Sequence, residues 1–319
     1  MRPGAAFRDN ADMAIKVPAA QPQYAHPAQL PIRKLRDATQ TLLRADQIWQ
    51  SYVARMPARL EVIKDHDQHA IVTVVRLDTP PPIDELNVPL RNCVHDGRSA
   101  LDNLIQQLAR KNNATEQQLR RVAFLVADSE PQWNRAWRER LGGLSAETVT
   151  RVRNIQPFIS PEPPGPRHPL AMLHDLWNAD KHGDGFSAAV GLSPRALRST
   201  IGTLRMTIDP EQFDKVREAW SDVDLAMDVD LGPILDGTRL LTVRLPEVVS
   251  LDALEAASVN AQVTLALIGP GVSITDSAIA SLANALRYAR DAVRYVADGV
   301  DDVPVAFPPG VIERSDGPD

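Results

Sequence analysis

The chain has 319 residues, of which 44% are hydrophobic and 24% charged, and its formal net charge is −6. This length suits one elaborated domain or two modest ones with a proper core, and the acidic balance argues against a protein that coats nucleic acid. A single cysteine, Cys93, excludes a disulfide framework. The N-terminal residues lack the apolar stretch of a signal peptide, and no apolar run approaches the length of a membrane span. We therefore expect a cytoplasmic protein without a membrane partner.

The first third of the sequence predicts a long helix and then a strand. Residues 1–30 show no periodicity and are expected to be disordered or loosely attached. Apolar residues then recur at helical spacing from Leu35 to Leu60, with a weak point at Met56-Pro57. The β-branched run 69–77 predicts a strand, which the prolines of 79–82 end.

The middle third predicts a series of helices. A second long helix is expected from Ile83 or Leu86 to Ala109, because apolar residues line one face of that stretch. Shorter helices are expected at 116–123, 131–141 and 145–155. The proline-dense segment 156–170 predicts a stiff loop, which leads into a helix containing LHDLWNADKH (173–182).

The last third changes to a period of two, which is typical of strands. Strands are expected at 199–208, 221–231, 241–245 and 261–269, with a turn at Asp236-Gly237. A final amphipathic helix follows at 279–296.

This order of elements predicts an α+β fold. An N-terminal helical bundle layer should pack with a mainly antiparallel sheet, and the C-terminal helix should return to the helical layer. The expected divisions are the N-terminal segment 1–30, a mainly helical domain 31–183 with a short strand or hairpin near 69–77, a strand-rich region with the last helix at 184–299, and a flexible tail at 300–319.

Two helical stretches carry the residues that are suited to chemistry. His95, Arg98 and Asp102 share one face of the second long helix, because they are three and four residues apart. On the 173–182 helix, His174, Asn178 and His182 recur every four residues, with Lys181 beside them. If the two helices pack together, these side chains could converge.

Three interpretations of this polar junction remain open. It could be structural, with an Arg98–Asp102 ion pair and histidines that hydrogen-bond across the helices. It could catalyse phosphodiester chemistry, with a histidine as acid or base and Arg98 or Lys181 stabilising charge. A metal site is disfavoured, because His174 and His182 are two turns apart and no H-E-x-x-H pattern occurs. We expect no metal and no cofactor.

Charge is unevenly placed along the chain. From Arg110 to Arg153 there are nine Lys/Arg and five Asp/Glu, whereas from Thr207 to Asn260 there are four Lys/Arg and twelve Asp/Glu. Such a basic stretch is usually a solvated face, but it could also contact RNA. The candidate nucleic-acid-binding residues are Arg135, Arg138, Arg151, Arg153 and Trp137, although tryptophans four residues apart, such as Trp133 and Trp137, more often belong to a core.

The stretch His95–Asn103, HDGRSALDN, resembles the pattern H-x-L-R-S-A-L-D-H of a bacterial protein family. In that family an F-P-[IV]-like element, a Q-P-[YF] element and a helix ending N-x-D-K-H-R follow in order. The counterparts here are AFLVA (123–127), QPF (156–158) and NADKH (178–182). This family has no assigned activity, so the resemblance implies no reaction or cofactor.

The chain departs from the family pattern at three positions. Gly97 replaces the usual leucine, Asn103 the second histidine, and Gly183 the last arginine.

The helical part is also loosely similar to the HEPN group of helical ribonucleases and nucleotide-binding proteins. Their signature is an arginine, four to six residues and a histidine, whereas Arg91 and His95 have three residues between them.

From these observations we expect a non-enzymatic binding or regulatory protein whose polar junction is structural. The alternative is an HEPN-like, metal-independent nuclease or defence factor that acts on RNA and uses Arg98, Lys181 and His182. The sequence does not identify the partner, which could be RNA or another protein, and it does not give the oligomeric state.

Overall fold

The computed structural model describes residues 25–159, 167–181, 185–192, 207–208, 228–229, 233–244, 250–255, 258–261, 263–270, 272–274, 277–299 and 304. The helices are α1 (Gln29–Val53), α2 (Ile83–Lys111), α3 (Glu116–Leu119), α4 (Glu130–Leu141), α5 (Ala146–Asn154), α6 (Pro169–Lys181) and α9 (Ala278–Asp298). A 3-10 turn, η1, covers Leu251–Ala253. The expected α+β class is confirmed.

Strands occupy both the early and the late part of the chain. Their bounds are β1 (Ala58–Asp65), β2 (Ala70–Leu77), β3 (Ser187–Gly191), β4 (Thr207–Ile208), β5 (Asp228–Val229), β6 (Arg239–Arg244), β7 (Leu254–Glu255), β8 (Ser258–Asn260), β9 (Thr264–Gly269) and β10 (Val272–Ile274). One sheet has the order β5-β6-β2-β1-β8, a second β10-β9-β3, and β4 pairs with β7. Every pairing in these sheets is antiparallel.

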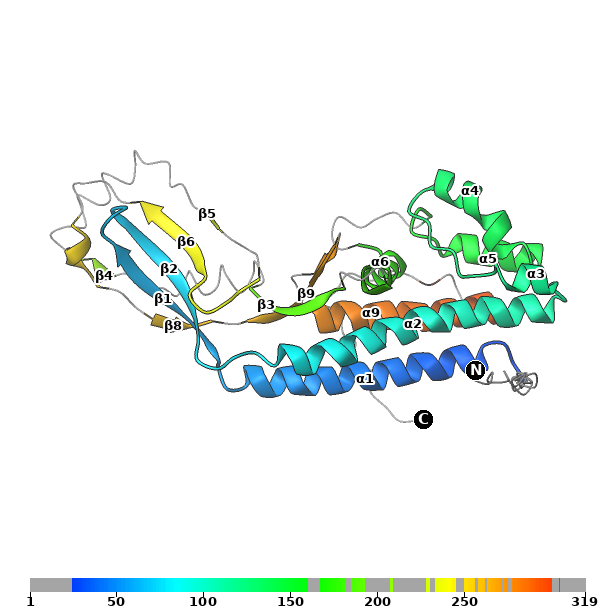
Figure 1. Cartoon of the computed structure of the whole chain (residues 1–319), viewed down its shortest axis with the longest axis horizontal. Coiled ribbons are helices and arrows are strands. Elements are labelled where there is room, and N and C mark those ends of the chain that lie inside the picture. The colour runs from blue at the N-terminus through cyan, green and yellow to red at the C-terminus, as the bar shows by residue number, and fades with distance from the viewer. Residues whose placement is uncertain are drawn as a thin grey trace, which may run out of the picture.

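The longest helices, α1 and α2, run side by side, and α9 lies along them (Figure 1). The five-stranded sheet projects from the end of the helical layer where α1 finishes and α2 starts, whereas α3, α4 and α5 lie near the other end of α2. The C-terminal helix therefore returns to the helical layer, as its apolar stripe predicts. Buried side chains from α1, α2, α6 and α9 form one core with those of β3 and β9.

The first long helix is shorter than its apolar pattern predicts. It ends at Val53, and Met56 adopts a positive φ of 51° just before Pro57. Leu60, which the helical stripe included, is buried instead on strand β1. The expectation of a helix to Leu60 is wrong because the backbone turns at Met56-Pro57, and β1 then pairs along its whole length with β2.

The other helices start and stop near their expected positions. At the α2–α3 turn, Thr115 and Gln118 form a capping box, but α3 ends at Leu119 rather than at Ala123. The Ser145 hydroxyl accepts a hydrogen bond from the Thr148 backbone nitrogen and so caps α5. Of the strands expected at 199–208 and 221–231, only the short pieces β4 and β5 lie within the described residues, and the rest of both ranges lies outside them.

Gly97, near the middle of α2, marks the closest approach of three helices. A Cβ atom at this position would lie 2.8 Å from a terminal carbon of Leu286 on α9 and 3.4 Å from one of Leu173 on α6. The glycine therefore allows α6 and α9 to pack closely against α2. The polar cluster begins at the next residue of α2, Arg98.

Candidate functional site

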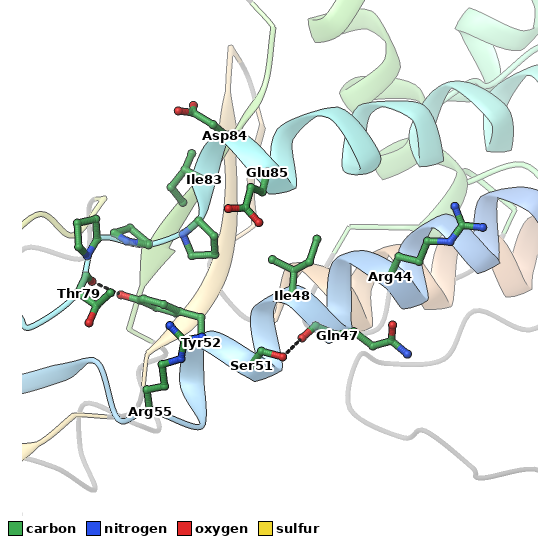
Figure 2. Close-up of a pocket in the computed structure, with 13 residues that line it drawn as sticks. Arg44, Gln47, Ile48, Ser51, Tyr52, Arg55, Thr79, Ile83, Asp84 and Glu85 are labelled. Carbon is green, nitrogen blue, oxygen red and sulfur yellow. Dashed lines mark hydrogen bonds between the residues drawn. The ribbon is translucent and has the colours of Figure 1, made fainter.

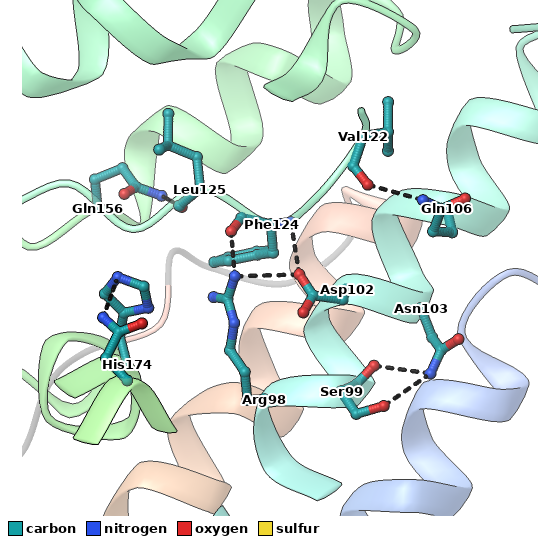
Figure 3. A network of polar contacts seen from close by, with 11 residues as sticks. Arg98, Ser99, Asp102, Asn103, Gln106, Val122, Phe124, Leu125, Gln156 and His174 are labelled. Carbon is teal, nitrogen blue, oxygen red and sulfur yellow. Dashed lines mark hydrogen bonds and ion pairs between the residues drawn. The ribbon is translucent and has the colours of Figure 1, made fainter. Parts of the chain in front are cut away.

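Arg98 and Asp102 of α2 hold the backbone of Phe124 (Figure 3). The Arg98 Nη2 atom donates to the Phe124 carbonyl oxygen over 2.5 Å and to Asp102 Oδ1 over 3.1 Å. The same Asp102 oxygen accepts a hydrogen bond of 2.8 Å from the Phe124 nitrogen. The ion pair predicted from the sequence is present, and it binds both backbone polar groups of a single residue.

Two glutamines hold the neighbouring residues of this segment. Gln106 Nε2 donates to the Val122 carbonyl oxygen over 2.8 Å. Gln156, which is fully buried, donates to the Leu125 carbonyl and accepts from the Ala127 nitrogen over 2.9 Å. Residues 122–127 belong to no helix or strand. We call this stretch the clamped segment, because side chains supply the partners that secondary structure would otherwise give its backbone.

Arg98 is held in an environment that is nearly closed to solvent. Only 4% of the residue is exposed, and its guanidinium carbon lies 5.8 Å from the Phe124 ring centroid and 5.3 Å from that of Trp177. Burial lowers the pKa of Arg98, and the nearby charge of Arg140 lowers it further, whereas Asp102 raises it. The charge of Arg98 is therefore stabilised by Asp102 and by two aromatic faces.

His174, on α6, faces the same cluster. Its Nε2 atom is 3.1 Å from the amide nitrogen of Asn178, and its ring stacks on Trp177 with a centroid distance of 6.2 Å. Burial lowers the pKa of His174 to about 4, with a smaller contribution from the charge of Arg98. The imidazole is therefore neutral at pH 7.

The remaining candidate catalytic residues do not join this cluster in the described part of the chain. Lys181 lies at the end of α6 with its Nζ atom 4.7 Å from the Trp177 ring centroid. The His95 side chain is 64% exposed, and its Nδ1 atom lies 3.6 Å from the carboxylate of its neighbour Asp96. His182 lies outside the described residues. The structure thus brings together Arg98, Asp102, His174 and Asn178, and leaves His95 at the surface.

The candidate nucleic-acid-binding residues divide into two groups. Arg151 and Arg153 of α5 are engaged by Glu147 and by Glu130, the latter over 2.6 Å. Arg135 and Arg138 of α4 are exposed, and neither has an acidic partner among the described residues. The Arg138 guanidinium lies over the ring of Trp137 at 5.2 Å.

The two tryptophans of α4 also differ from each other. Trp133 is buried against Phe158, whereas Trp137 is only partly buried at the edge of the core. Trp133 is therefore a core residue, and Trp137 remains accessible on one side.

A second charged network, beside the clamped segment, is not apparent from the sequence. Arg167 contacts Asp128 over 2.9 Å and also pairs with Asp175 of α6. His168 accepts a hydrogen bond at Nδ1 from the Leu170 nitrogen and so caps the start of α6. Burial lowers the pKa of His168 to about 4. These residues lie in or next to a proline-dense stretch without periodicity, which gives no signal of a contact with α6.

A pocket lies elsewhere, between α1 and the start of α2 (Figure 2). This pocket has a volume of about 680 Å³. Tyr52 lies at its base and donates a hydrogen bond of 3.1 Å to the Thr79 carbonyl. Its charged lining residues include Arg44 of α1, Arg55 just beyond the end of α1, and Glu85 of α2. The lining has no histidine or cysteine, but it includes the Ser51 hydroxyl and the carboxylates of Asp84 and Glu85.

Metal-binding clusters and membrane-spanning helices are both absent from the described ranges. No group of three or more His, Cys, Asp or Glu side chains within them is placed to hold a metal ion. None of the described helices carries an apolar stretch of the length that a bilayer crossing requires.

Comparison with known proteins gives no assignment. No protein-family model, curated protein or solved structure matches the chain. The inference about function therefore rests on the geometry of the cluster.

That geometry is better suited to holding the chain than to reacting with a substrate. A catalytic acid or base has to reach the proton that it transfers, and a charge-stabilising arginine has to reach the reacting group. Here the Nη2 edge of Arg98 and one oxygen of Asp102 are already occupied by the Phe124 backbone. Of the four motif elements in the sequence, the one at 123–127 forms most of the clamped segment, and those at 95–103 and 156–158 supply side chains that bind its backbone.

Proposed function

We propose that this chain is a non-enzymatic binding or regulatory protein in which the polar junction is structural. The observation that carries the proposal is that Arg98 and Asp102 both bind the backbone of Phe124. Through this contact and those of Gln156, the clamped segment connects α2 to the α4–α5 unit. The junction holds α2 and the α4–α5 unit in fixed positions, and the surface that these elements present binds the partner.

The test is an assay of single-stranded RNA degradation by the wild-type chain and by Lys181→Ala and His182→Ala variants. We expect no degradation by the wild type above the level of the two variants. A rate that falls by about 10²-fold or more in His182→Ala would be the size of a lost general acid or base, and it would overturn the proposal in favour of a nuclease. Circular dichroism of each variant controls for loss of folding.

A second candidate function is RNA binding by the α4 surface. It is favoured by the exposed Arg135 and Arg138, which lie three residues apart on one helix without a described acidic partner, next to the partly exposed Trp137. Adjacent cations bind phosphates without reading sequence, and an accessible aromatic ring can stack on a base.

The matched comparison lies within the same helical unit. In fluorescence anisotropy with a single-stranded RNA oligonucleotide, Arg135→Ala/Arg138→Ala should weaken binding several-fold. The slope of log K against log salt concentration should also fall in magnitude by about one for each phosphate contact that the variant loses. Arg151→Ala/Arg153→Ala should have less effect, because these two arginines already pair with glutamates. Equal effects of the two double variants would rule out the α4 surface as the specific site.

A further inference from the structure

Arg98 uses only part of its hydrogen-bonding capacity in the clamp. Both hydrogens of Nη2 are taken by the Phe124 carbonyl and by Asp102. The Nε and Nη1 atoms are buried and have no hydrogen-bond partner among the residues that the structure describes. The rings of Phe124 and Trp177 attract the cation but are not strong hydrogen-bond acceptors. Buried donors of a charged group that lack a partner carry a large desolvation penalty.

His174 supplies one more unpartnered buried atom on the same side. Its Nδ1 is buried without a partner in the described ranges, while Nε2 faces the amide nitrogen of Asn178. An amide nitrogen can only donate, so Nε2 is the acceptor and the proton of the neutral ring is on Nδ1. Figure 3 shows the His174 ring on the side of Arg98 that is turned away from Asp102.

Four unused N–H bonds are therefore available here: one at Arg98 Nε, two at Nη1 and one at His174 Nδ1. A water molecule has two acceptor sites, whereas a phosphate or carboxylate group offers at least four. Such a group also carries the negative charge that a buried guanidinium favours. The nearest other acid acting on His174, Asp128, is already engaged by Arg167 over 2.9 Å.

We propose that Arg98 and His174 bind a small oxyanion, a phosphate or carboxylate group, on the side of Arg98 opposite Asp102. The ligand class is set by the donors: a planar cation that binds oxyanions in fixed geometry, and a neutral imidazole that donates. His174, Trp177 and Asn178 are each partly exposed, so the group lies one side chain below the surface. Any larger part of a ligand would extend past Trp177 and Lys181.

This inference rests on the proposed function, because it takes Arg98 to be fixed by the clamp and gives the binding protein a ligand. The two can fail separately. RNA degradation that depends on His182 would remove the proposed function and leave an oxyanion site in place. A site that takes up no oxyanion would leave the structural junction intact.

The experiment uses the full chain, with inorganic phosphate and acetate as the probes and chloride at equal ionic strength as the reference. Nitrogen-15 NMR follows Arg98 Nε and the two His174 ring nitrogens during titration, and thermal unfolding is measured in parallel. We expect saturable shifts of Arg98 Nε and His174 Nδ1, and a rise of about 3 °C or more in Tm for at least one probe. The response to phosphate against acetate identifies which group the site prefers.

His174→Phe keeps a ring against Trp177 but removes the donor, and it should lose most of the Tm rise. His95→Phe makes the same change at an exposed position on α2 and should keep it. Chemical shifts that do not move with either probe in the folded wild type would overturn the proposal. An equal Tm rise in wild type and His174→Phe would also overturn it, since salts of this kind stabilise proteins generally by exclusion from the surface.

Discussion

At the scale of single residues, Asp102 is the side chain on which the junction depends. Its carboxylate neutralises the buried guanidinium of Arg98, and the same carboxylate oxygen accepts a hydrogen bond from the Phe124 backbone nitrogen. Removing it strands a charge and a backbone donor at the same time, and both are costly when buried.

We predict that Asp102→Ala lowers the free energy of unfolding by about 2–3 kcal/mol, somewhat less than a fully buried pair because the Asp102 side chain is 31% exposed. Urea unfolding followed by circular dichroism measures this. Asp96→Ala is the control on the same helix, since the Asp96 carboxylate lies 3.6 Å from the exposed His95 and its loss should cost less than about 0.5 kcal/mol. Equal losses in the two variants would show that Asp102 is not a structural anchor.

The two buried histidines predict a specific loss of stability in acid. Both His168 and His174 have a folded pKa of about 4, below the ordinary value of 6.5. Above pH 6.5 neither the folded nor the unfolded state binds these protons, so the histidines contribute no pH dependence. Between pH 6.5 and about 4 the unfolded chain takes up protons that the folded chain does not, and stability falls as the pH falls.

After allowance for partial exposure, we expect each histidine to cost about 1 kcal/mol between pH 7 and pH 5. His168→Asn keeps an acceptor for the start of α6 and cannot titrate, so it should lose less stability over this interval than the wild type. Chemical denaturation at the two pH values tests this, with the exposed His66→Asn as control. If the stability of His168→Asn falls between pH 7 and pH 5 as much as that of the wild type, His168 is not a source of the pH dependence.

At the scale of elements, Gly97 controls how closely three helices approach. We predict that Gly97→Leu destabilises the chain by about 3 kcal/mol or more, because a side chain there meets Leu286 of α9 and Leu173 of α6. Gly97→Ala should change stability by less than about 1 kcal/mol, since the gain in helix propensity offsets a contact with the movable end of Leu286. Thermal unfolding of both variants measures the difference. If Gly97→Leu is as stable as the wild type, α6 and α9 pack less closely against α2 than the structure indicates.

The elements show where sequence patterns predict structure and where they do not. The apolar stripes of α2 and α9 predict those helices, because a buried helical face has a regular period. The pattern failed at Leu60, where an apolar residue in helical register lies on a strand instead. Apolar spacing alone cannot separate the two states when a turn changes the backbone direction between them.

The clamped segment shows the same limit at the site. The (i, i+4) ion pair of Arg98 and Asp102 could be predicted, because its spacing is local. The contact of this ion pair with Phe124 could not be predicted, because Phe124 lies 22 positions after Asp102 and 26 positions after Arg98 in the sequence. The roles of Gln156, Arg167 and His168 were missed for the same reason, since each depends on non-local contacts of an aperiodic segment.

At the scale of the whole molecule, Arg91 connects the helical layer to the strands that follow α6. Its guanidinium donates to the Phe186 carbonyl over 3.0 and 3.2 Å and pairs with Asp180 over 3.4 Å. We predict that Arg91→Met speeds amide hydrogen exchange at residues 186–191 by about tenfold or more, because these hydrogen bonds anchor the start of β3 to α2. Mass spectrometry of exchanged peptides measures this.

Arg59→Met provides the control, since its ion pair with Asp78 is exposed and 3.7 Å long. Exchange at residues 186–191 should be unchanged in that variant. If Arg91→Met also leaves exchange there unchanged, β3 is held by its pairing with β9 and by the hydrogen bonds that Ser187 and Ala188 donate to Asn87 of α2.

The return of α9 to the first helices has a consequence for how the protein is made. Its buried face completes a core shared with α1, α2 and α6. During synthesis, the apolar stripes of those three helices emerge from the ribosome more than ninety residues before α9 does. Until then the apolar side chains that pack on α9 stay exposed, so the nascent chain should depend on chaperones over this interval. Premature termination before residue 278 should give an aggregating product rather than a smaller folded one.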